Sequence, residues 1–224
     1  MAIAVVFSSG RSGTNMVCEI LSGSKELYPT EPTEDKEVFN RDAIYRDGYL
    51  TKTDTTYCRS YRYNFMPVML RNPAMRIIWT IRDPRDWAMS KLRAGWQRQS
   101  DDATFDGCLA DLYHMLDLFK RGRNDFPQRI YPIKMENILL NTVYEIKQLC
   151  KWLNIKYDDK MPEFYKRMRH AGKRARYDKV DKGQVELWKD WQNVYQGFMT
   201  KVDIDIEELF KYLEPITKFF GYKD

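Results

Sequence analysis

The sequence predicts an α/β fold in which a mostly parallel sheet is flanked by helices. Two short apolar runs, AIAVVF at 2–7 and RIIWTI at 76–81, are typical of strands buried on both faces of a sheet. Each run is followed by a short loop and then by a helical pattern, and this alternation is typical of α/β proteins. Because 224 residues are enough for one sizeable core, we expect one domain spanning 1–224.

The elements between and after these runs are predicted from periodicity and capping signals. A first helix is expected from about Thr14 to Leu27. Residues 28–66 hold several prolines, and only Tyr49–Thr53 suggests a brief strand there. After RIIWTI, a capping Asp83 and a proline at the first helical position predict the start of another helix.

The second half of the chain continues the alternation. An amphipathic helix is expected over 104–121, a strand over about 129–135 and a helix over 142–153. Thr142 and Glu145 stand at capping-box spacing at the start of that last helix. A terminal helix over 206–219 contains Pro215, which we expect to kink or break it.

Composition excludes several classes of protein. The net charge of +5 suits a pocket for an anion but not a non-specific nucleic-acid binder, which would carry a concentrated basic tail. The four cysteines lie forty or more residues apart and only two histidines accompany them, so a structural zinc site is not expected. With no signal peptide and no membrane-length apolar run, we expect a soluble cytoplasmic protein without a membrane partner.

The stretch SSGRSGTN at 8–15 joins the first strand to the first helix. Glycines permit close approach of the backbone to a ligand, and N–H groups at a helix start bind anions. Arg11 adds a charged fork suited to phosphate-like oxygens. The stretch lacks the lysine and the magnesium-binding hydroxyl of the nucleotide-triphosphatase loop, which argues against Mg-ATP chemistry. The residues expected to bind the ligand are Ser9, Gly10, Arg11, Ser12, Gly13, Thr14 and Asn15.

A second stretch, IRDPRDWAMS at 81–90, places an arginine at the end of a strand and a serine eight residues later. Helical periodicity brings Asp86 and Ser90 to the face that looks back toward Arg82. Arg82 and Ser90 at this separation are suited to gripping one further phosphate. A structural ion pair of Arg82 with Asp83 or Asp86 is the alternative.

With these two motifs in order, the sequence resembles the sulfotransferase family. SSGRSGTN is similar to the family's 5′-phosphosulfate loop, in the form common in the carbohydrate-type branch, and IRDPRDWAMS is similar to its 3′-phosphate motif. The segment DKGQVELWKDW resembles the family's C-terminal lysine–glycine loop, which adds Lys182 and Gly183 to the 3′-phosphate site. The resemblance implies a P-loop-like architecture.

The same resemblance implies the reaction and the cofactor. The co-substrate would be 3′-phosphoadenosine 5′-phosphosulfate, the product adenosine 3′,5′-bisphosphate, and no metal would take part. Sulfuryl transfer depends on positioning and positive charge, so Arg11 is expected to stabilise the transferring group. Two departures affect the adenine contacts: Met16 stands where cytosolic relatives carry tryptophan, and Met135-Glu136-Asn137 replaces the Tyr-Glu-Asp pattern.

The catalytic base has two candidates. In LTKTDTTY, Lys52 matches the lysine of the family's Lys-Thr-His segment and Asp54 stands in place of its histidine. Carbohydrate-type and tyrosyl-type relatives use a glutamate, often before proline, and Glu31 precedes Pro32 in PTEPTED. We favour Glu31 because its context matches the same branch as the loop. His114 and His170 are assigned no catalytic role.

The acceptor and the broader class of function stay open at this stage. Residues 41–66 are rich in arginine and tyrosine, which suits a polar small-molecule or carbohydrate acceptor as well as a solvated basic surface. A small-molecule kinase or other phosphotransferase is one alternative function. A non-catalytic nucleotide- or RNA-binding module that uses the basic segment 166–182 is the other. The sequence leaves the oligomeric state undetermined.

Overall fold

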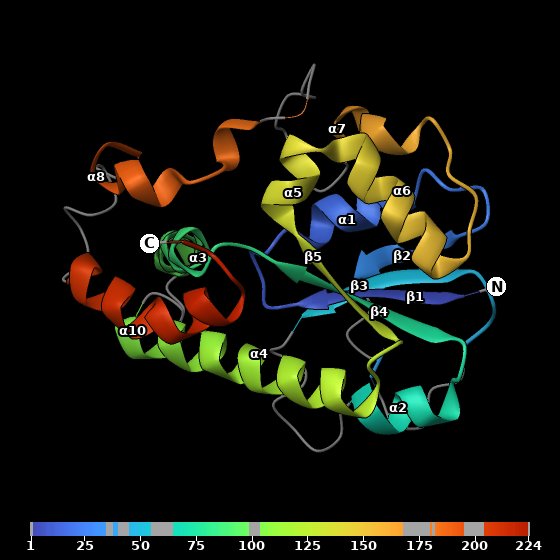
Figure 1. Cartoon of the computed structure of the whole chain (residues 1–224), viewed down its shortest axis with the longest axis horizontal. Coiled ribbons are helices and arrows are strands. Elements are labelled where there is room, and N and C mark those ends of the chain that lie inside the picture. Colours follow the sequence, from blue (N-terminus) through green and yellow to red (C-terminus); the bar gives the residue numbers. More distant parts are fainter. Residues whose placement is uncertain are drawn as a thin grey trace.

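A single parallel sheet forms the centre of the computed structural model (Figure 1). The structure describes residues 2–34, 38–39, 45–54, 65–98, 104–167, 180, 182–194 and 204–223. Within these ranges the strand order is β2-β3-β1-β4-β5, and every neighbouring pair is parallel. The strands are β1 (Ile3–Ser8), β2 (Tyr28–Glu34), β3 (Tyr49–Asp54), β4 (Met75–Ile81) and β5 (Ile130–Lys134).

Helices cover both faces of this sheet, as Figure 1 shows. One face is covered by α1 (Thr14–Leu21), α5 (Met135–Leu140), α6 (Thr142–Leu153) and α7 (Phe164–Arg167). The other face is covered by α2 (Phe65–Arg71), α3 (Pro84–Arg98), α4 (Phe105–Asp125) and α10 (Ile206–Phe219). The shorter elements are α8 (Trp191–Val194) and the 3₁₀ turns η3 (Met161–Glu163), η5 (Lys182–Gln184) and η6 (Leu187–Asp190).

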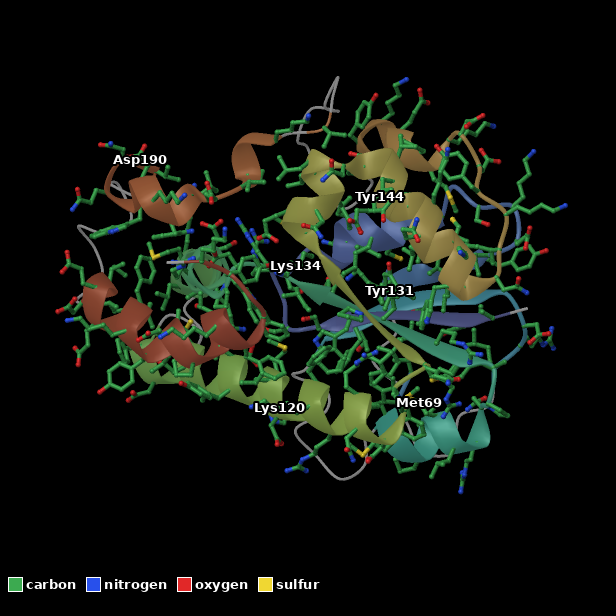
Figure 2. The ribbon with its side chains drawn as sticks, viewed as in Figure 1. Met69, Lys120, Tyr131, Lys134, Tyr144 and Asp190 are labelled. Atoms are coloured by element: carbon green, nitrogen blue, oxygen red, sulfur yellow. The ribbon has the colours of Figure 1, made fainter. Side chains whose placement is uncertain are left out.

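Side-chain alternation along the strands builds two hydrophobic cores. Val6 and Ile78 face α1 and α6, whereas Phe7 and Trp79 face the α4 side. Trp79 lies at the centre of an aromatic cluster, with ring centroids 4.7 Å from Phe7 and 5.3 Å from Phe119. Figure 2 shows side chains filling the space between the sheet and its helices. The predicted α/β architecture is confirmed.

Local predictions in the first half are confirmed at the strands and corrected in two places. The first helix ends at Leu21, not Leu27, because the chain turns at Ser22–Ser24 and enters β2 at Tyr28. The sequence reading missed β2, a strand that contains two prolines. It lies at the edge of the sheet, where a missing N–H is tolerated, and its register with β3 shifts between Pro29 and Glu34.

Two further predictions are corrected in the second half of the chain. The predicted capping box at Thr142 and Glu145 is wrong, because Thr142 is already helical and its hydroxyl donates to the carbonyl of Ile138 at 2.7 Å. Helix α10 continues through Pro215 to Phe219 without a break. Leu213 and Ile216 on either side of the proline are fully buried, so packing holds the helix together there. The predicted cap and proline at the start of α3 are confirmed, since Asp83 Oδ1 accepts from the Arg85 N–H at 3.0 Å.

The five strands of the sheet are parallel, so their carboxyl ends lie side by side at one end of the sheet. This end is the carboxyl edge, which is distinct from the lateral edge formed by β2. In Figure 1 this edge faces α3 and lies opposite the N-terminus. The loop after β1 and the start of α3 after β4 both lie at this edge, because β1 and β4 are neighbours in the sheet. In Figure 2, Lys134 lies at the same end of β5, where α5 begins.

Candidate active site at the carboxyl edge of the sheet

The loop between β1 and α1, the predicted anion cradle, contains two residues with a positive φ. Gly13 adopts φ 98° at the cap of α1, and a Cβ there would approach Met135 Cγ to 3.2 Å, so glycine is required by both backbone and space. Arg11 also has a positive φ, 77°, which costs a non-glycine residue about 1–3 kcal/mol. Strain of this kind is concentrated at functional sites.

The two predicted motifs are in direct contact. Arg11 Nε donates to Ser90 Oγ at 3.2 Å, across 79 positions of sequence. The Arg11 side chain is exposed, whereas Ser90 on α3 is 9% exposed. A solvent-facing guanidinium therefore lies against the serine predicted to hold the second phosphate.

Arg82 lies at the end of β4 and is buried, with 6% of its surface exposed. Its Nε has no hydrogen-bond partner among the described residues. Among the described residues, the predicted alternative ion pair of Arg82 with Asp83 or Asp86 is not formed. The carboxylate of Asp83 is held by Arg85 at 2.8 Å and 3.0 Å, and Arg82 acts on Asp86 through its charge without a salt bridge. An unpaired buried donor carries a desolvation cost that an anionic ligand would relieve.

The hydroxyl groups of the loop face the protein. Ser9 Oγ donates to Asp111 Oδ2, while Ser12 Oγ donates to the Ser9 carbonyl at 2.7 Å and lies 2.8 Å from Thr80 Oγ1. Any contact of Ser9 and Ser12 with a bound phosphate therefore comes from their backbone N–H groups. Thr14 begins α1 and is largely buried, and Asn15 is exposed.

The other predicted site residues are distributed around this loop. Asp54 is the last residue of β3 and lies in register with Ser8, directly before the loop. Lys52 is buried on β3. Burial of the Cys18 thiol raises its pKa to about 12, and the positive charge of Lys52 acts in the opposite direction. Glu31 lies one strand further out, in the irregular part of β2. The side chains of Glu31 and Asp54 lie outside the described part of the structure.

The C-terminal motif crosses the same edge of the sheet. Lys182 and Gly183 are exposed on η5, which packs against α5. Further along that segment, the Trp188 N–H donates to Asp86 Oδ1 at 2.6 Å. The segment thus reaches the start of α3, although the roles of Lys182 and Gly183 remain predictions.

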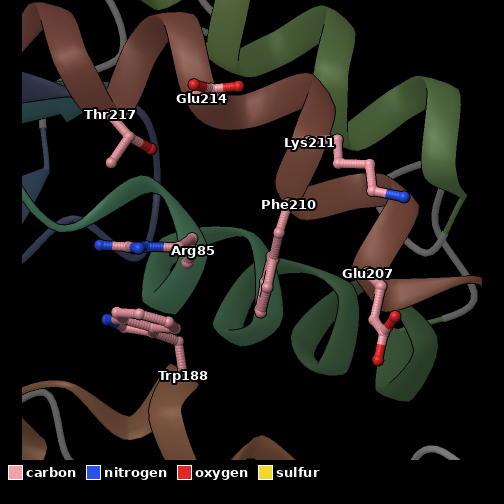
Figure 3. Close-up of a pocket in the computed structure, with 7 residues that line it drawn as sticks. All are labelled: Arg85, Trp188, Glu207, Phe210, Lys211, Glu214 and Thr217. Atoms are coloured by element: carbon pink, nitrogen blue, oxygen red, sulfur yellow. The ribbon is translucent and has the colours of Figure 1, made fainter. Parts of the chain in front are cut away.

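Arg85 connects three segments that the sequence reading did not bring together. Besides clamping Asp83, it donates to the Lys223 carbonyl at 2.6 Å and lies 3.4 Å from the centroid of the Trp188 ring. Figure 3 shows Arg85 stacked on Trp188 beside a cavity of about 300 Å³, which is also lined by residues of α10. Glu136 links the same segments, accepting from the Asp83 N–H and from Tyr222 Oη, each at 2.8 Å.

Several further residues hold the loop and were missed because their contacts are long-range. Trp87 Nε1 donates to the Gly10 carbonyl at 2.7 Å, and Lys91 Nζ lies 2.8 Å from Asp111 Oδ2. Asp111 carried a readable signal: it falls on the helix face formed by Cys108, Leu112 and Met115, at positions i, i+3, i+4 and i+7. An acidic residue on a buried face requires a partner.

The histidines and the possible metal ligands can be placed only within the described residues. His114 lies on α4, and His170 lies outside the described residues. Among the described side chains, no group of three or more His, Cys, Asp or Glu residues converges on a metal site. Cys18, Cys108 and Cys150 are buried free thiols. No helix within the described ranges combines the length and apolar character needed to cross a bilayer.

Asp86 is the most perturbed acid at this edge. Burial raises the pKa of its carboxyl from the usual 3.8 to about 6, while Arg82 acts in the opposite direction. Its side chain is fully buried, and its Oδ2 has no hydrogen-bond partner within the described residues. The folded protein therefore binds this proton more tightly than the unfolded chain does.

We expect the substitution Asp86→Asn to change stability in a pH-dependent way. Between about pH 4 and pH 6 the wild type loses stability because Asp86 ionises in the unfolded chain while the folded protein keeps the proton; the variant has no such loss. The free energy of unfolding of the variant, relative to wild type, should therefore rise over this window by about 3 kcal/mol and stay constant above it. Urea unfolding at a series of pH values measures this, with Asp117→Asn on exposed α4 surface as control. A difference that does not vary with pH would contradict the shifted pKa.

Comparison with known proteins finds a family match over part of the chain. Residues 60–159 match the model described as the sulfotransferase family, a range that includes Arg82 and Ser90. An uncharacterized protein of Aquifex aeolicus (strain VF5) is 22% identical over 253 residues, covering 93% of this chain. The chain spans about a third, 33%, of the length of that curated relative.

Solved structures share the fold over the whole chain. The sulfotransferase domain of the Synechococcus PCC 7002 olefin synthase matches with a TM-score of 0.62 at 14% identity, covering 100% of this chain and 96% of that one. Retinol dehydratase in complex with retinol and PAP matches with a TM-score of 0.52 at 15% identity, covering 99% and 82%. The predicted P-loop-like fold and the resemblance to sulfotransferases are confirmed. The carbohydrate-type branch stays a prediction.

Proposed function

We propose that this chain, which combines the sulfotransferase fold with a match to the sulfotransferase family, transfers a sulfuryl group from 3′-phosphoadenosine 5′-phosphosulfate to a hydroxyl or amine acceptor. The observation that carries the proposal is the contact of Arg11 with Ser90, which joins the two predicted phosphate motifs. The retinol dehydratase structure with PAP, taken here as the product adenosine 3′,5′-bisphosphate, supports this choice of nucleotide.

The residues present fit such a nucleotide. The start of α1 offers backbone N–H groups at the positive end of the helix dipole, and Arg11 faces solvent beside them. Arg82 presents a buried Nε that has no protein partner among the described residues, close to the charge of Asp86. Together these groups would hold two separate phosphates, the 5′-group at the loop and the 3′-group at α3, with Lys182 and Gly183 at its far side.

The reaction follows from charge and proton movements at these groups. The bound donor supplies a sulfuryl group attached to a phosphate leaving group. Arg11 stabilises the negative charge that develops on the leaving oxygen as the sulfur–oxygen bond breaks. A carboxylate, for which we favour Glu31 over Asp54, accepts the proton of the acceptor hydroxyl or amine as the new bond forms between sulfur and the acceptor oxygen or nitrogen. No step requires a metal, and Lys52 adds positive charge on the neighbouring strand.

The adenine would be held differently from the tryptophan-containing relatives. Met16 is buried in the core on the α1 face, so it presents no flat surface to a base. Met135 packs against Gly13 at the start of the cradle. A thioether beside the site contributes a soft apolar contact in place of aromatic stacking.

Thermal stabilisation by nucleotides tests this proposal. Adenosine 3′,5′-bisphosphate at about 100 times its Kd should stabilise the folded protein by about 2.7 kcal/mol, because it binds only the folded state. For a chain of this size the corresponding rise in Tm is roughly 5–10 °C. ATP with magnesium should give a much smaller shift at the same concentration. Stabilisation by Mg-ATP alone would favour a phosphotransferase, and salt-sensitive binding of RNA alone would favour a nucleic-acid module.

A further inference from the structure

Three polar side chains are buried together behind the loop. Ser9 comes from the loop, Lys91 from α3 and Asp111 from α4, and their residues are 0%, 4% and 0% exposed. One oxygen, Asp111 Oδ2, accepts from Ser9 Oγ and also lies 2.8 Å from Lys91 Nζ. The carboxylate therefore ties two elements of the candidate site to α4.

Burial of the Lys91 and Asp111 charges is unfavourable in free energy. Taking two charges out of water costs several kcal/mol per ion, and apolar residues of similar volume often give equal or better stability. A buried ion pair is therefore weak support for stability and a better indication of a positional requirement. The places of Ser9, Lys91 and Asp111 in the chain indicate which segments of the site they hold.

The pair brackets the contact between the two phosphate motifs. Lys91 directly follows Ser90, and Ser9 precedes Arg11 by two residues. Arg11 and Ser90 meet at 3.2 Å on the solvent side, while Ser9, Asp111 and Lys91 join the same two segments on the inner side. The separation of loop and helix is therefore fixed from both sides.

Charge balance gives the pair a second effect. An anion-binding loop requires positive potential, and an uncompensated carboxylate behind it would oppose a bound phosphosulfate. Lys91 Nζ, in contact with Asp111, cancels that charge locally. Asp111 can thus fix Ser9 without weakening the cradle.

We propose that Lys91 and Asp111 are positioning residues that hold the phosphosulfate loop at its working distance from α3 while keeping the site free of net negative charge. This inference rests on the proposed nucleotide site and names residues outside both motifs that it depends on. Neither residue touches the nucleotide in this account.

Three variants separate the effect on nucleotide binding of the Ser9–Asp111 hydrogen bond from the effect of the Lys91 and Asp111 charges. Ser9→Ala removes only the hydroxyl that donates to Asp111 and should weaken binding of adenosine 3′,5′-bisphosphate about fivefold. Lys91→Met removes the positive charge that contacts Asp111 Oδ2 and should weaken binding at least about tenfold. The double variant Lys91→Met/Asp111→Asn removes both charges while an amide oxygen still accepts from Ser9, so it should recover to within about threefold of wild type.

Titration calorimetry with adenosine 3′,5′-bisphosphate gives these dissociation constants on folded protein. Asp117→Asn breaks the exposed Arg121–Asp117 pair on the same helix and should change nothing. A purely structural role would lower the Tm of the variants and leave their Kd at the wild-type value, which would overturn the inference. If Lys91→Met does not fold, Ser9→Ala and the double variant still decide it. Failure of the wild type to bind would instead refute the proposed function.

Discussion

Replacing Arg11 by glycine is expected to lower kcat about 100- to 1,000-fold while the fold remains intact. The guanidinium is the exposed charge of the cradle and the partner of Ser90, so its loss removes stabilisation of the developing negative charge. Glycine suits this position, because Arg11 has a φ of 77° that glycine adopts without strain. Relief of strain offsets loss of the hydrogen bond to Ser90 and should leave the free energy of unfolding within about 1 kcal/mol of wild type.

The measurement combines turnover with urea unfolding. Asn154→Gly is the matched control, since Asn154 also has a positive φ, 55°, at the end of α6 and outside the candidate site. The control should keep its activity and its stability. Arg11→Lys, which keeps the charge and loses the fork, should fall between wild type and Arg11→Gly. Full activity in Arg11→Gly would show that the loop does not act through this charge.

The loop after β1 and the start of α3 could be located from the sequence, whereas the fold around them could be predicted only in part. The loop and the start of α3 depend on local signals: glycines, a cap, a proline and a charged residue at fixed spacing. Each of these signals acts over fewer than ten residues. The contact of Arg11 with Ser90 then follows from the adjacency of β1 and β4.

The elements that were missed depend on tertiary context. The two prolines of β2 argue against a central strand, and only its place at the edge of the sheet makes them acceptable. Helix α10 overrides Pro215 because the residues around it are buried against α3 and α4. Propensity is a local quantity, so it could not predict either outcome.

The side chains that support the site could not be predicted from the sequence, because they also depend on tertiary contacts. Asp111 and Arg85 act on segments 102 and 138 positions away, on Ser9 and Lys223. No spacing rule links such positions. Only the acidic residue on the apolar face of α4 marked one of them in advance.

The largest effect on chemistry without an effect on binding is expected from Glu31→Gln. Loss of a general base that takes the acceptor proton should lower kcat about 100- to 10,000-fold. The amide keeps the shape of the carboxylate, and Glu31 belongs to β2 and to neither phosphate motif, so affinity for adenosine 3′,5′-bisphosphate should stay at the wild-type value. Transfer of labelled sulfate from 3′-phosphoadenosine 5′-phosphosulfate to a panel of sugars and phenols measures the rate.

Asp54→Asn is the companion variant, because the backbone of Asp54 lies in register with Ser8 at the entrance to the loop. If Glu31 is the base, the variant Asp54→Asn should retain most of the wild-type turnover, since Asp54 then takes no proton from the acceptor. Wild-type turnover in Glu31→Gln together with a large loss in Asp54→Asn would identify Asp54 as the catalytic base. Asp54 lies on β3, two residues after Lys52. A large loss in both variants, with nucleotide affinity intact, would mean that the proton passes between the two carboxylates, so that neither Glu31 nor Asp54 acts as the base alone.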